Sequence, residues 1–519
     1  MNDLKVLRAE KTWQRAGAYS VRIQGMNRQY HIALQDEFDE HDGEKSKYIV
    51  LLDDEYPVAT CRFYELDKST VLVGRVVVLP EYRGQRLGSR VIKEAEKWIK
   101  ELGYNQVRID SRVEAVGFYE KLGYTRMDDE VIKSWNFDCK RMYKVLRGRK
   151  TKNLDKYRGC LIGGAAGDAL GYAIEFWDEK SIFRKFGEKG ITEYELTNGK
   201  ALISDDTQMT LFTANGLLYG TTRGRMRGIM APYPSYIANC YKDWFRTQTE
   251  SYPVDKEKPF AYSWLLDIPE LFHYRAPGNT CMSAISVGTY GSVNEPINRS
   301  KGCGGVMRVA PVGLYFDNGT IPDSELDMIG AEAAAITHGH ELGYILAATM
   351  THIIRRLAHE DISMEEAVRS ALNTTADMFK NAKEIGYYLS LMNKAVELSA
   401  KDISDLEAIH ILGQGWVAEE ALAIAVYCAL KYPDDIDKAL IAAVNHRGDS
   451  DSTGAIAGNI VGANVGLSGI PEKYKKNLEL YDVIIEIADD LYNDCKMSEY
   501  GDYEDDVWVS KYIERTYLK

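Results

Sequence analysis

The sequence predicts two domains of different fold class, an N-terminal α/β domain and a C-terminal domain that is mainly α. At 519 residues, the chain exceeds what a single hydrophobic core usually supports. Short strand-like runs and one amphipathic helix occupy the first 147 residues, whereas Ala-, Leu- and Ile-rich helical periodicity dominates after residue 153. We therefore expect an α/β domain over residues 1–147, a basic linker over 148–153, a helical domain over 154–497 and a tail over 498–519.

The expected boundary coincides with a basic, glycine-containing stretch, residues 147–153 (RGRKTKN). Domain boundaries fall in such solvated segments. The tail is acidic and aromatic, which fits either a docked terminal helix or a loose segment. The sequence leaves that choice open.

Charge, cysteine spacing and apolar runs indicate which binding partners and which cellular compartment to expect. The chain has 64 Lys and Arg and 77 Asp and Glu, so its net charge is −13. This charge repels phosphate backbones and disfavours nucleic acid as a partner. The eight cysteines show no CxxC spacing and the N-terminus has no apolar signal region, so we expect reduced thiols in the cytoplasm. The uncharged run 453–470 is rich in Gly, Ala and Asn, which favours a packed helix over a membrane span. The oligomeric state stays open.

A glycine-bearing turn in the first region has the pattern of an anion site. Residues 71–79 form a strand-like run, and residues 82–89 (YRGQRLGS) then lead into a helix that is apolar on one face. A turn from a strand into a helix N-terminus directs free backbone amides at an anion, typically a pyrophosphate. Arg83 and Arg86 would add positive charge there.

Together with residues 115–124 (AVGFYEKLGY), the RGQRLG turn resembles the GNAT family of acetyl-CoA-dependent N-acetyltransferases over about residues 1–147. The resemblance implies a mixed sheet split by a V-shaped opening that holds acetyl-CoA. It implies cofactor contacts from seven consecutive residues, Arg83, Gly84, Gln85, Arg86, Leu87, Gly88 and Ser89. The family pattern favours Gly at the position of Arg86, so the approach of this loop to the phosphates can differ here.

The same resemblance implies that Tyr119 is a general acid that protonates the departing thiolate. The alternative is that this ring only packs a short helix onto the sheet. The general base is not fixed by the sequence, and Glu81, Asp128 and Glu130 are the candidates. The amine acceptor stays open.

Two acidic clusters distinguish the second region, SDDTQ at residues 204–208 and RGDSDSTG at residues 447–454. Each places carboxylates beside hydroxyls at the start of an apolar, helix-like run. Oxygen-only clusters suit a hard cation such as Mg²⁺ or Mn²⁺. The alternative is helix capping, but one carboxylate is enough for a cap and each cluster has two. An EF-hand is excluded because the twelfth loop position falls on Ile460 rather than on Glu.

Small residues dominate the run that begins the second region, residues 157–176 (YRGCLIGGAAGDALGYAIEF). Their spacing allows a second helix to approach closely. The run also carries Asp168 and Glu175, seven residues apart, which places both on one face of a helix. A carboxylate among Gly and Ala in an interior helix must be paired or bound to a ligand.

Six motifs in order resemble the ADP-ribosylglycohydrolase family over about residues 154–497: GDALGYAIEF, SDDTQ, KGCGGVMRVAP, ITHGH, GQGWVAEEAL and RGDSDSTGAIAGNIVGA. The resemblance implies an all-α fold with two Mg²⁺ ions, Mn²⁺ being possible, in a cleft between helices. It assigns one ion to Ser204, Asp205, Asp206 and Asp451, and the other to Asp449, Asp451 and Ser452. It also implies catalytic roles for Glu175, Asp206 and Asp449.

The resemblance further implies a set of substrate contacts, Asp168, Gly302, Gly304, Gly305, Met307, Arg308, Gly415 and Trp416. Glycines in such a loop allow the ADP-ribose phosphates to approach the backbone. Arg308 is either a phosphate clamp or a buried structural partner, and Trp416 either stacks on the ligand or packs in the core. His338 and His340 suit packing or orienting roles rather than binding a hard metal.

Three residues depart from the pattern of the ADP-ribosylglycohydrolase family. Ser204 and Ser452 stand where Thr is usual, which keeps the hydroxyl ligand. Cys303 stands where Asn is usual, which leaves the geometry of the ribose or phosphate subsite open.

These observations predict a bifunctional cytoplasmic enzyme. The C-terminal domain is expected to be a Mg²⁺-dependent hydrolase that cleaves the bond between ADP-ribose and a modified protein or small molecule, and the N-terminal domain an acetyl-CoA-dependent N-acetyltransferase. The alternatives are an ADP-ribose-binding module without turnover, or a metal-dependent hydrolase of another N-glycosylated or phosphorylated small molecule. The acceptor linkage is left open.

Overall fold

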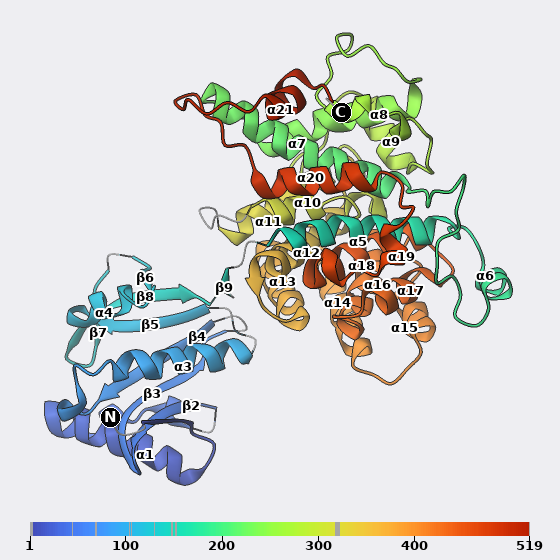
Figure 1. Cartoon of the computed structure of the whole chain (residues 1–519). Coiled ribbons are helices and arrows are strands. Elements are labelled where there is room, and N and C mark those ends of the chain that lie inside the picture. The colour runs from blue at the N-terminus through green and yellow to red at the C-terminus, as the bar shows by residue number, and fades with distance from the viewer. Residues whose placement is uncertain are drawn as a thin grey trace. The chain divides into compact units, whose positions relative to one another are not determined.

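The structure is a computed structural model that describes residues 4–43, 45–67, 70–102, 104, 106–128, 130–146, 149–150, 153–316 and 322–517. The chain divides into two compact units, Met1–Arg147 and Gly148–Lys519 (Figure 1). Of the expected basic linker, only residues 149, 150 and 153 are among the described residues.

The first unit is built on a mixed sheet with the strand order β1-β2-β3-β4-β5-β8-β6, and β7 pairs with β8. The pairing of β4 with β5 is parallel and the others are antiparallel. The strands are β1 Lys5–Arg8, β2 Lys47–Asp53, β3 Tyr56–Glu65, β4 Thr70–Val78, β5 Gln106–Arg112, β6 Thr125–Arg126, β7 Ile132–Ser134 and β8 Phe137–Val145.

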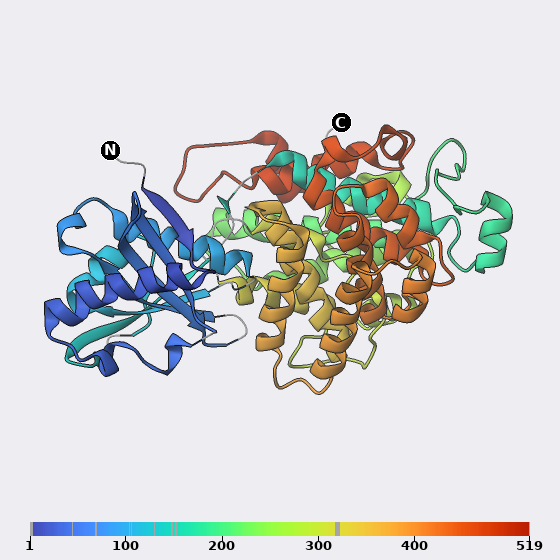
Figure 2. The ribbon, with the colours of Figure 1, turned by 90° about the horizontal axis from the view of Figure 1, so that it is seen from below.

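Helices cover both faces of this sheet. Along β2, Val50 packs with Ala18 of α1 (Thr12–Arg22), whereas Ile49 belongs to the cluster that includes Val91 of α3 (Leu87–Glu101). Since successive side chains of a strand point to opposite faces, α1 and α3 lie on opposite sides. Figure 2 shows α1 lying across one face. Shorter helical segments are Ile23–Arg28, α2 Leu34–Glu37, Glu40–Asp42, Pro80–Tyr82, Val113–Ala115 and α4 Val116–Glu120.

The two parallel strands separate part-way along their length. Pairing of β4 with β5 runs only from Thr70↔Gln106 to Leu72↔Arg108, although both strands continue beyond it. β4 also bulges against β3, because Gly74 pairs with Arg62 and Val77 pairs with Thr60, which leaves two residues opposite one. The opening between β4 and β5 confirms the split mixed sheet that the sequence predicts.

The second unit is helical, which confirms the fold class expected for it. Its helices are α5 Leu154–Tyr172, α6 Glu179–Phe186, α7 Asp205–Arg227, α8 Tyr233–Thr249, α9 Asn279–Ser286, α10 Ala310–Tyr315, α11 Asp323–Ala335, α12 Glu341–His359, α13 Met364–Met378, α14 Ile385–Ser399, α15 Asp405–Leu412, α16 Ala418–Lys431, α17 Ile436–Val444, α18 Ser450–Val465, α19 Glu472–Lys475, α20 Tyr481–Asn493 and α21 Asp506–Val509. Two short strands, β9 Arg149–Lys150 and β10 Glu360–Asp361, pair with each other.

Helices α5 and α18 are packed against each other through their backbones. A Cβ atom on Gly163 would lie 2.4 Å from the carbonyl oxygen of Gly458, and one on Gly171 would lie 2.2 Å from that of Ser450. The contacts run in opposite sequence directions, so the helices are antiparallel (Figure 1). This packing brings the C-terminal end of α5 to the N-terminal end of α18, where the second acidic cluster lies.

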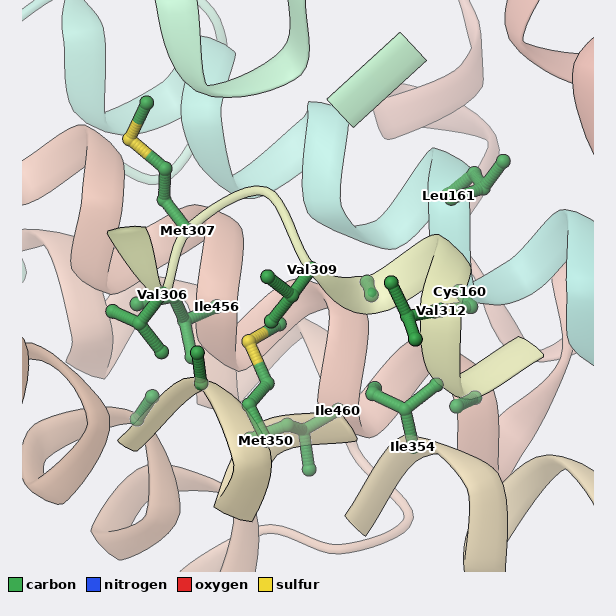
Figure 3. Close-up of a cluster of buried hydrophobic side chains, with 14 of the residues drawn as sticks. Cys160, Leu161, Val306, Met307, Val309, Val312, Met350, Ile354, Ile456 and Ile460 are labelled. Carbon is green, nitrogen blue, oxygen red and sulfur yellow. The ribbon is translucent and has the colours of Figure 1, made fainter. Parts of the chain in front are cut away.

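The hydrophobic core surrounds this helix pair. Figure 3 shows part of it, with Val309 pointing toward Met350 of α12. Met307 points away from Met350, and its sulfur lies 3.9 Å from the hydroxyl of Ser452 at the start of α18. The core therefore packs, through Met307, against the acidic segment at the start of α18.

The C-terminal segment packs onto the second unit. The indole of Trp508 donates to the hydroxyl of Thr222 (2.9 Å), and the hydroxyl of Tyr512 donates to Asp490 (2.6 Å). Both rings are buried. Across the described part of the chain, every helix is too short or too polar to cross a bilayer.

Candidate functional site

Asp168 organises the start of α7. Its side chain is fully buried, and its oxygens accept hydrogen bonds from the amides of Ser204 (2.9 and 3.1 Å) and Thr207 (3.0 Å) and from the Thr207 hydroxyl. Burial, with the nearby charge of Asp451, raises the pKa of Asp168 to about 7. Asp168 therefore holds the backbone at the start of α7, where the first acidic cluster lies.

The first acidic cluster lies at the N-terminus of α7. Ser204 is the N-cap, and its hydroxyl oxygen accepts from the amide of Asp206 (3.2 Å). Asp205 accepts from the amide of Gly278 (3.2 Å). One oxygen of Asp206, Oδ1, is buried without a hydrogen-bond partner among the described residues. Burial and the charge of Asp451 raise the pKa of both Asp205 and Asp206 well above its ordinary value.

The second acidic cluster lies at the N-terminus of α18. Asp449 is the N-cap and accepts from the amide of Ser452 (3.3 Å), and Asp451 accepts from the same amide (3.0 Å). The thiol of Cys303 donates to the other oxygen of Asp449 (2.8 Å). Burial and Asp451 raise the pKa of Asp449 well above its ordinary value. Asp449 therefore caps α18, as the capping alternative predicts, and it also lies among other buried carboxylates.

Glu175 joins the second cluster from the end of α5. The helix ends at Tyr172, so Glu175 lies in the following turn, where its amide donates to the carbonyl of Gly171 (2.9 Å). One oxygen each of Glu175, Asp449 and Asp451 lie within 4.8 Å of one another. Glu175 Oε2 is buried and has no hydrogen-bond partner in the described part of the chain. Burial, followed by the charges of Asp451 and Asp449, raises the pKa of Glu175 to about 10.

These residues fit a hard divalent cation. The donors are carboxylate and hydroxyl oxygens, and Glu175 Oε2 and Asp206 Oδ1 are buried without a hydrogen-bond partner among the described residues. The carboxylates also raise one another's pKa, which is the electrostatic cost that a bound cation removes. The packing of α5 against α18 brings Glu175, Asp449 and Asp451 together, and Asp205 and Asp206 lie close enough for electrostatic coupling.

The glycine loop lies beside the second cluster. Gly302 pairs with Val417, and a short 3-10 helix follows over Cys303–Gly305. His338 packs beneath it, since a Cβ atom on Gly304 would lie 3.1 Å from its imidazole. Burial, helped by Arg308, lowers the pKa of His338 to about 3, which keeps the ring neutral. His338 therefore supports the loop from the core.

Arg308 is directed into the core. Its fully buried guanidinium donates to the hydroxyl of Thr337 (2.7 Å) and the carbonyl of Ala333 (3.2 Å), and it lies 4.4 Å from the ring centre of Tyr241. This placement favours the structural alternative over a phosphate clamp. Met307 is also buried.

Trp416 lies at the surface, not in the core. Its side chain is 40% exposed and stacks on Phe176, with ring centres 5.7 Å apart and planes at 19°. Phe176 follows Glu175 directly, is 71% exposed and has a positive φ of 68°. The carbonyl of Trp416 accepts from the amide of Cys303 (3.3 Å). Gly415, with φ 87°, packs on Asp449 and Thr453.

Sequence reasoning missed several residues that complete this site. Arg275 holds the loop before α9 by pairing with Glu479 (3.0 Å), and its carbonyl accepts from the amide of Asp205 (3.1 Å). Gly278 and Phe176 also belong to this group. Arg275 and Gly278 stand outside the quoted motifs, whereas Phe176 ends the motif GDALGYAIEF without having been singled out. The partners of all three are far away in sequence. In the sequence alone, the positive charge of Arg275 is the one signal that could have marked any of these residues as a site candidate.

The first unit contains a cleft of about 750 Å³ where β4 and β5 separate. Six of the seven predicted cofactor residues line it, and Gln85 does not. Gly84 and Arg86 have positive φ values of 80° and 62°, so Arg86 adopts a backbone conformation that glycine adopts more easily. That conformation explains why the family pattern favours Gly at this position.

Tyr119 lies at the wall of the cleft and is buried. Burial raises the pKa of its phenol, which keeps the proton on the oxygen. Its ring also packs edge-on against Phe118 and Tyr124, with centres 4.9 and 5.7 Å apart, so both alternatives for this residue fit its position. The base candidates Glu81, Asp128 and Glu130 do not line the cleft, whereas four other acids do: Asp36, Glu37, Asp110 and Glu114.

The helical carboxylate site and the split-sheet cleft define an enzyme with one hydrolase-type and one acetyltransferase-type domain. Residues 149–500 match the family model described as ADP-ribosylglycohydrolase, and residues 13–124 match that of the acetyltransferase (GNAT) family. The chain therefore belongs to the ADP-ribosylglycohydrolase family and carries a GNAT acetyltransferase domain before the family's helical domain.

Similar proteins cover the two parts separately. ADP-ribosylhydrolase ARH3 of Mus musculus is 24% identical over 66% of this chain and 92% of its own length. An uncharacterized acetyltransferase of Streptococcus pyogenes is 30% identical over 24% of this chain and 82% of its own. Among solved structures, an ADP-ribosylglycohydrolase-related protein complex covers 66% of this chain and 98% of that chain at 21% identity, with a TM-score of 0.42. An N-acetyltransferase structure from Lactobacillus plantarum covers 28% of this chain and 99% of that chain at 27% identity, with a TM-score of 0.27.

Proposed function

We propose that the C-terminal domain is a Mg²⁺-dependent hydrolase that cleaves the glycosidic bond between ADP-ribose and a modified acceptor. The observation that carries the proposal is the meeting of Glu175, Asp449 and Asp451 within 4.8 Å, with one oxygen of Glu175 buried and unpartnered in the described part of the chain. The similarity to ADP-ribosylhydrolase ARH3 supports the substrate class.

The family resemblance implies two cation positions, which we adopt as part of this proposal. Ser204, Asp205, Asp206 and Asp451 would hold one ion, and Asp449, Asp451 and Ser452 the other. When bound, such ions align ribose hydroxyls and moderate the negative charge of the site. Mn²⁺ would satisfy the same oxygen ligands.

The residues of the chain supply positioning and proton transfer. Hydrolysis adds a water oxygen to the anomeric carbon and moves one proton from that water to the departing acceptor. We assign this transfer to Glu175, because one of its oxygens lies within 4.8 Å of oxygens of Asp449 and Asp451, and its buried Oε2 has no hydrogen-bond partner among the described residues. Asp168 fixes the start of α7, and the Cys303 thiol fixes Asp449. The glycine loop allows close approach of the phosphates.

The test is release of ADP-ribose from arginine-linked and serine-linked ADP-ribosyl peptides in Mg²⁺. We expect release by the intact protein, and its loss in EDTA and in the double variant Asp449→Ala/Asp451→Ala. Asp402→Ala, which removes an exposed carboxylate elsewhere, is the matched control and keeps full activity. Tight ADP-ribose binding without release would replace the hydrolase by a binding module.

We further propose that the N-terminal domain transfers an acetyl group from acetyl-CoA to an amine. The cleft, the Arg83–Ser89 loop at the start of α3 and the protonated phenol of Tyr119 support this activity. The amine nitrogen bonds to the thioester carbonyl carbon, the carbon–sulfur bond breaks, and Tyr119 gives its proton to the sulfur. The nitrogen loses one proton to solvent, and the phenolate of Tyr119 takes one back from solvent. Thiol release from acetyl-CoA in the presence of amines measures it.

A further inference from the structure

Arg112 lies at the end of β5 and lines the cleft of the acetyltransferase domain. Its guanidinium lies over two aromatic rings, 3.5 Å from the ring centre of Phe137 and 4.6 Å from that of Tyr30. A third contact comes from the sulfur of Met26, which is 3.4 Å from Nη2. These contacts hold the planar group in one orientation without neutralising its charge.

The charge of Arg112 has little compensation. Among the described residues, the carboxylate within ion-pair distance is that of Glu114, 3.9 Å away, and its side chain is 72% exposed. Arg112 itself is only 22% exposed. By contrast, Arg75 in the same cleft pairs with Asp39 at 3.0 Å. A mostly buried, pre-oriented guanidinium of this kind is suited to a bidentate anion such as a carboxylate.

An acid of opposite charge lies beside it. Asp110 precedes Arg112 by two residues on β5, so both project from the same face, about 6.5 Å apart along the strand. Asp110 also lines the cleft. The guanidinium of Arg108 donates to Oδ1 of Asp110 (3.4 Å), so Asp110 and Arg112 present one partly compensated negative group and one positive group to the cleft.

In the proposed acetyl transfer, the CoA phosphates would have a separate set of partners. The turn before α3 provides Arg83, Arg86 and the free amides at the N-terminus of the helix, which follows β4 rather than β5. Arg112 comes from β5, on the other side of the split. The remaining occupant of the cleft is the amine acceptor.

We propose that the acceptor carries a carboxylate besides its amine, and that Arg112 binds this carboxylate while Asp110 faces the ammonium group. This inference rests on the proposed acetyl transfer. The carboxylate can belong to a free amino acid or to the C-terminus of a short peptide, since both offer the same planar anion. The ammonium group first loses one proton to solvent. The neutral amine then takes the acetyl group and loses a second proton to solvent, while the departing sulfur is protonated by Tyr119 and leaves as the CoA thiol.

The test compares matched acceptors with the full-length protein. The probes are L-phenylalanine, L-phenylalaninamide, and the tripeptide Gly-Gly-Phe with a free or amidated C-terminus. Thiol release from acetyl-CoA gives kcat/KM, and the melting temperature with CoA and each probe gives binding without turnover. We expect at least one acid to exceed its amide by about tenfold or more, the free amino acid and the tripeptide separating the two sources.

Arg112→Met keeps the stem on Phe137 and removes the charge. It should abolish the preference for acids while leaving the KM for acetyl-CoA unchanged. The control is Arg126→Met, which removes an exposed guanidinium that does not line the cleft.

The outcomes distinguish failure of the carboxylate subsite from failure of the acetyl transfer on which it rests. Equal use of acids and amides, or a raised KM for acetyl-CoA in Arg112→Met, would overturn the carboxylate subsite. Acid-dependent stabilisation that Arg112→Met abolishes, without thiol release, would support the subsite and overturn acetyl transfer. Neither release nor stabilisation by any acid would overturn both.

Discussion

Gly167 of α5 lies directly against Gly454 of α18, so that a Cβ atom on Gly167 would stand 2.0 Å from the carbonyl oxygen of Gly454. Any side chain there must push the two helices apart. Because Asp168 and Glu175 follow on α5 and its turn while Asp449 and Asp451 precede Gly454, this contact sets the distance between the halves of the acidic site.

Gly167→Ala should therefore destabilise the helical domain by about 3 kcal/mol, since overpacking against backbone leaves no flexible group to yield. Urea unfolding measures the change. The matched control is Gly386→Ala in α14, where an added Cβ meets nothing within 4 Å and should change stability by about 1 kcal/mol or less. Equal effects of the two substitutions would contradict the close contact.

The close approach of α5 was predictable, whereas its partner was not. The glycines of the run 157–176 indicate that some helix packs tightly, but nothing in local spacing says that it is α18, almost 300 residues later. The acidic clusters were likewise predictable as oxygen-rich helix N-termini. The meeting of the second cluster with Glu175 depends on the long-range packing of α5 and α18.

Other features of the site had no local signal. The sequence allows Arg308 to be a phosphate clamp or a buried structural partner, and it allows Trp416 to stack on the ligand or pack in the core. The structure buries Arg308, which favours the structural role, and leaves Trp416 40% exposed, outside the core. The hydrogen bond from Cys303 to Asp449 joins residues 146 positions apart. Such partners follow from tertiary packing and not from periodicity.

Asp168→Ala should destabilise the domain by about 2 to 4 kcal/mol, because two buried amides and a hydroxyl at the start of α7 lose their acceptor. ADP-ribose release should fall as well, since Ser204 and Asp206 are no longer held. Calorimetric unfolding and the release assay measure the two effects. Asp489→Ala, which removes a partly exposed ion pair with Arg158, is the control and should cost about 1 kcal/mol or less. A stable but inactive Asp168→Ala protein would instead indicate direct substrate contact.

His338 should make the helical domain sensitive to acid. Burial lowers its pKa to about 3 in the folded protein, whereas the unfolded chain binds this proton near pH 6.5. The unfolded state then holds more protons below that pH, so the contribution of His338 to stability is full above pH 6.5 and is lost as the pH falls toward 3.

Unfolding free energies at pH 7 and pH 5 measure this loss. His338→Gln lowers stability at both pH values but should show a smaller drop between them than the wild type. The same slope in both proteins would show that the ring is protonated in the folded state.

Tyr119→Phe should separate the two alternatives for this residue. Phenylalanine keeps the edge-on contacts with Phe118 and Tyr124 and removes only the hydroxyl, so the melting temperature should hardly change. If Tyr119 is the general acid, kcat for thiol release should fall about 100-fold, within the range typical of such groups, while the KM for acetyl-CoA stays the same. Tyr124→Phe is the matched control: its hydroxyl donates to Glu96 (2.9 Å) outside the cleft, so it should reduce stability and leave kcat unchanged. An unchanged kcat in Tyr119→Phe would leave this ring with packing as its role, and another group would have to protonate the sulfur.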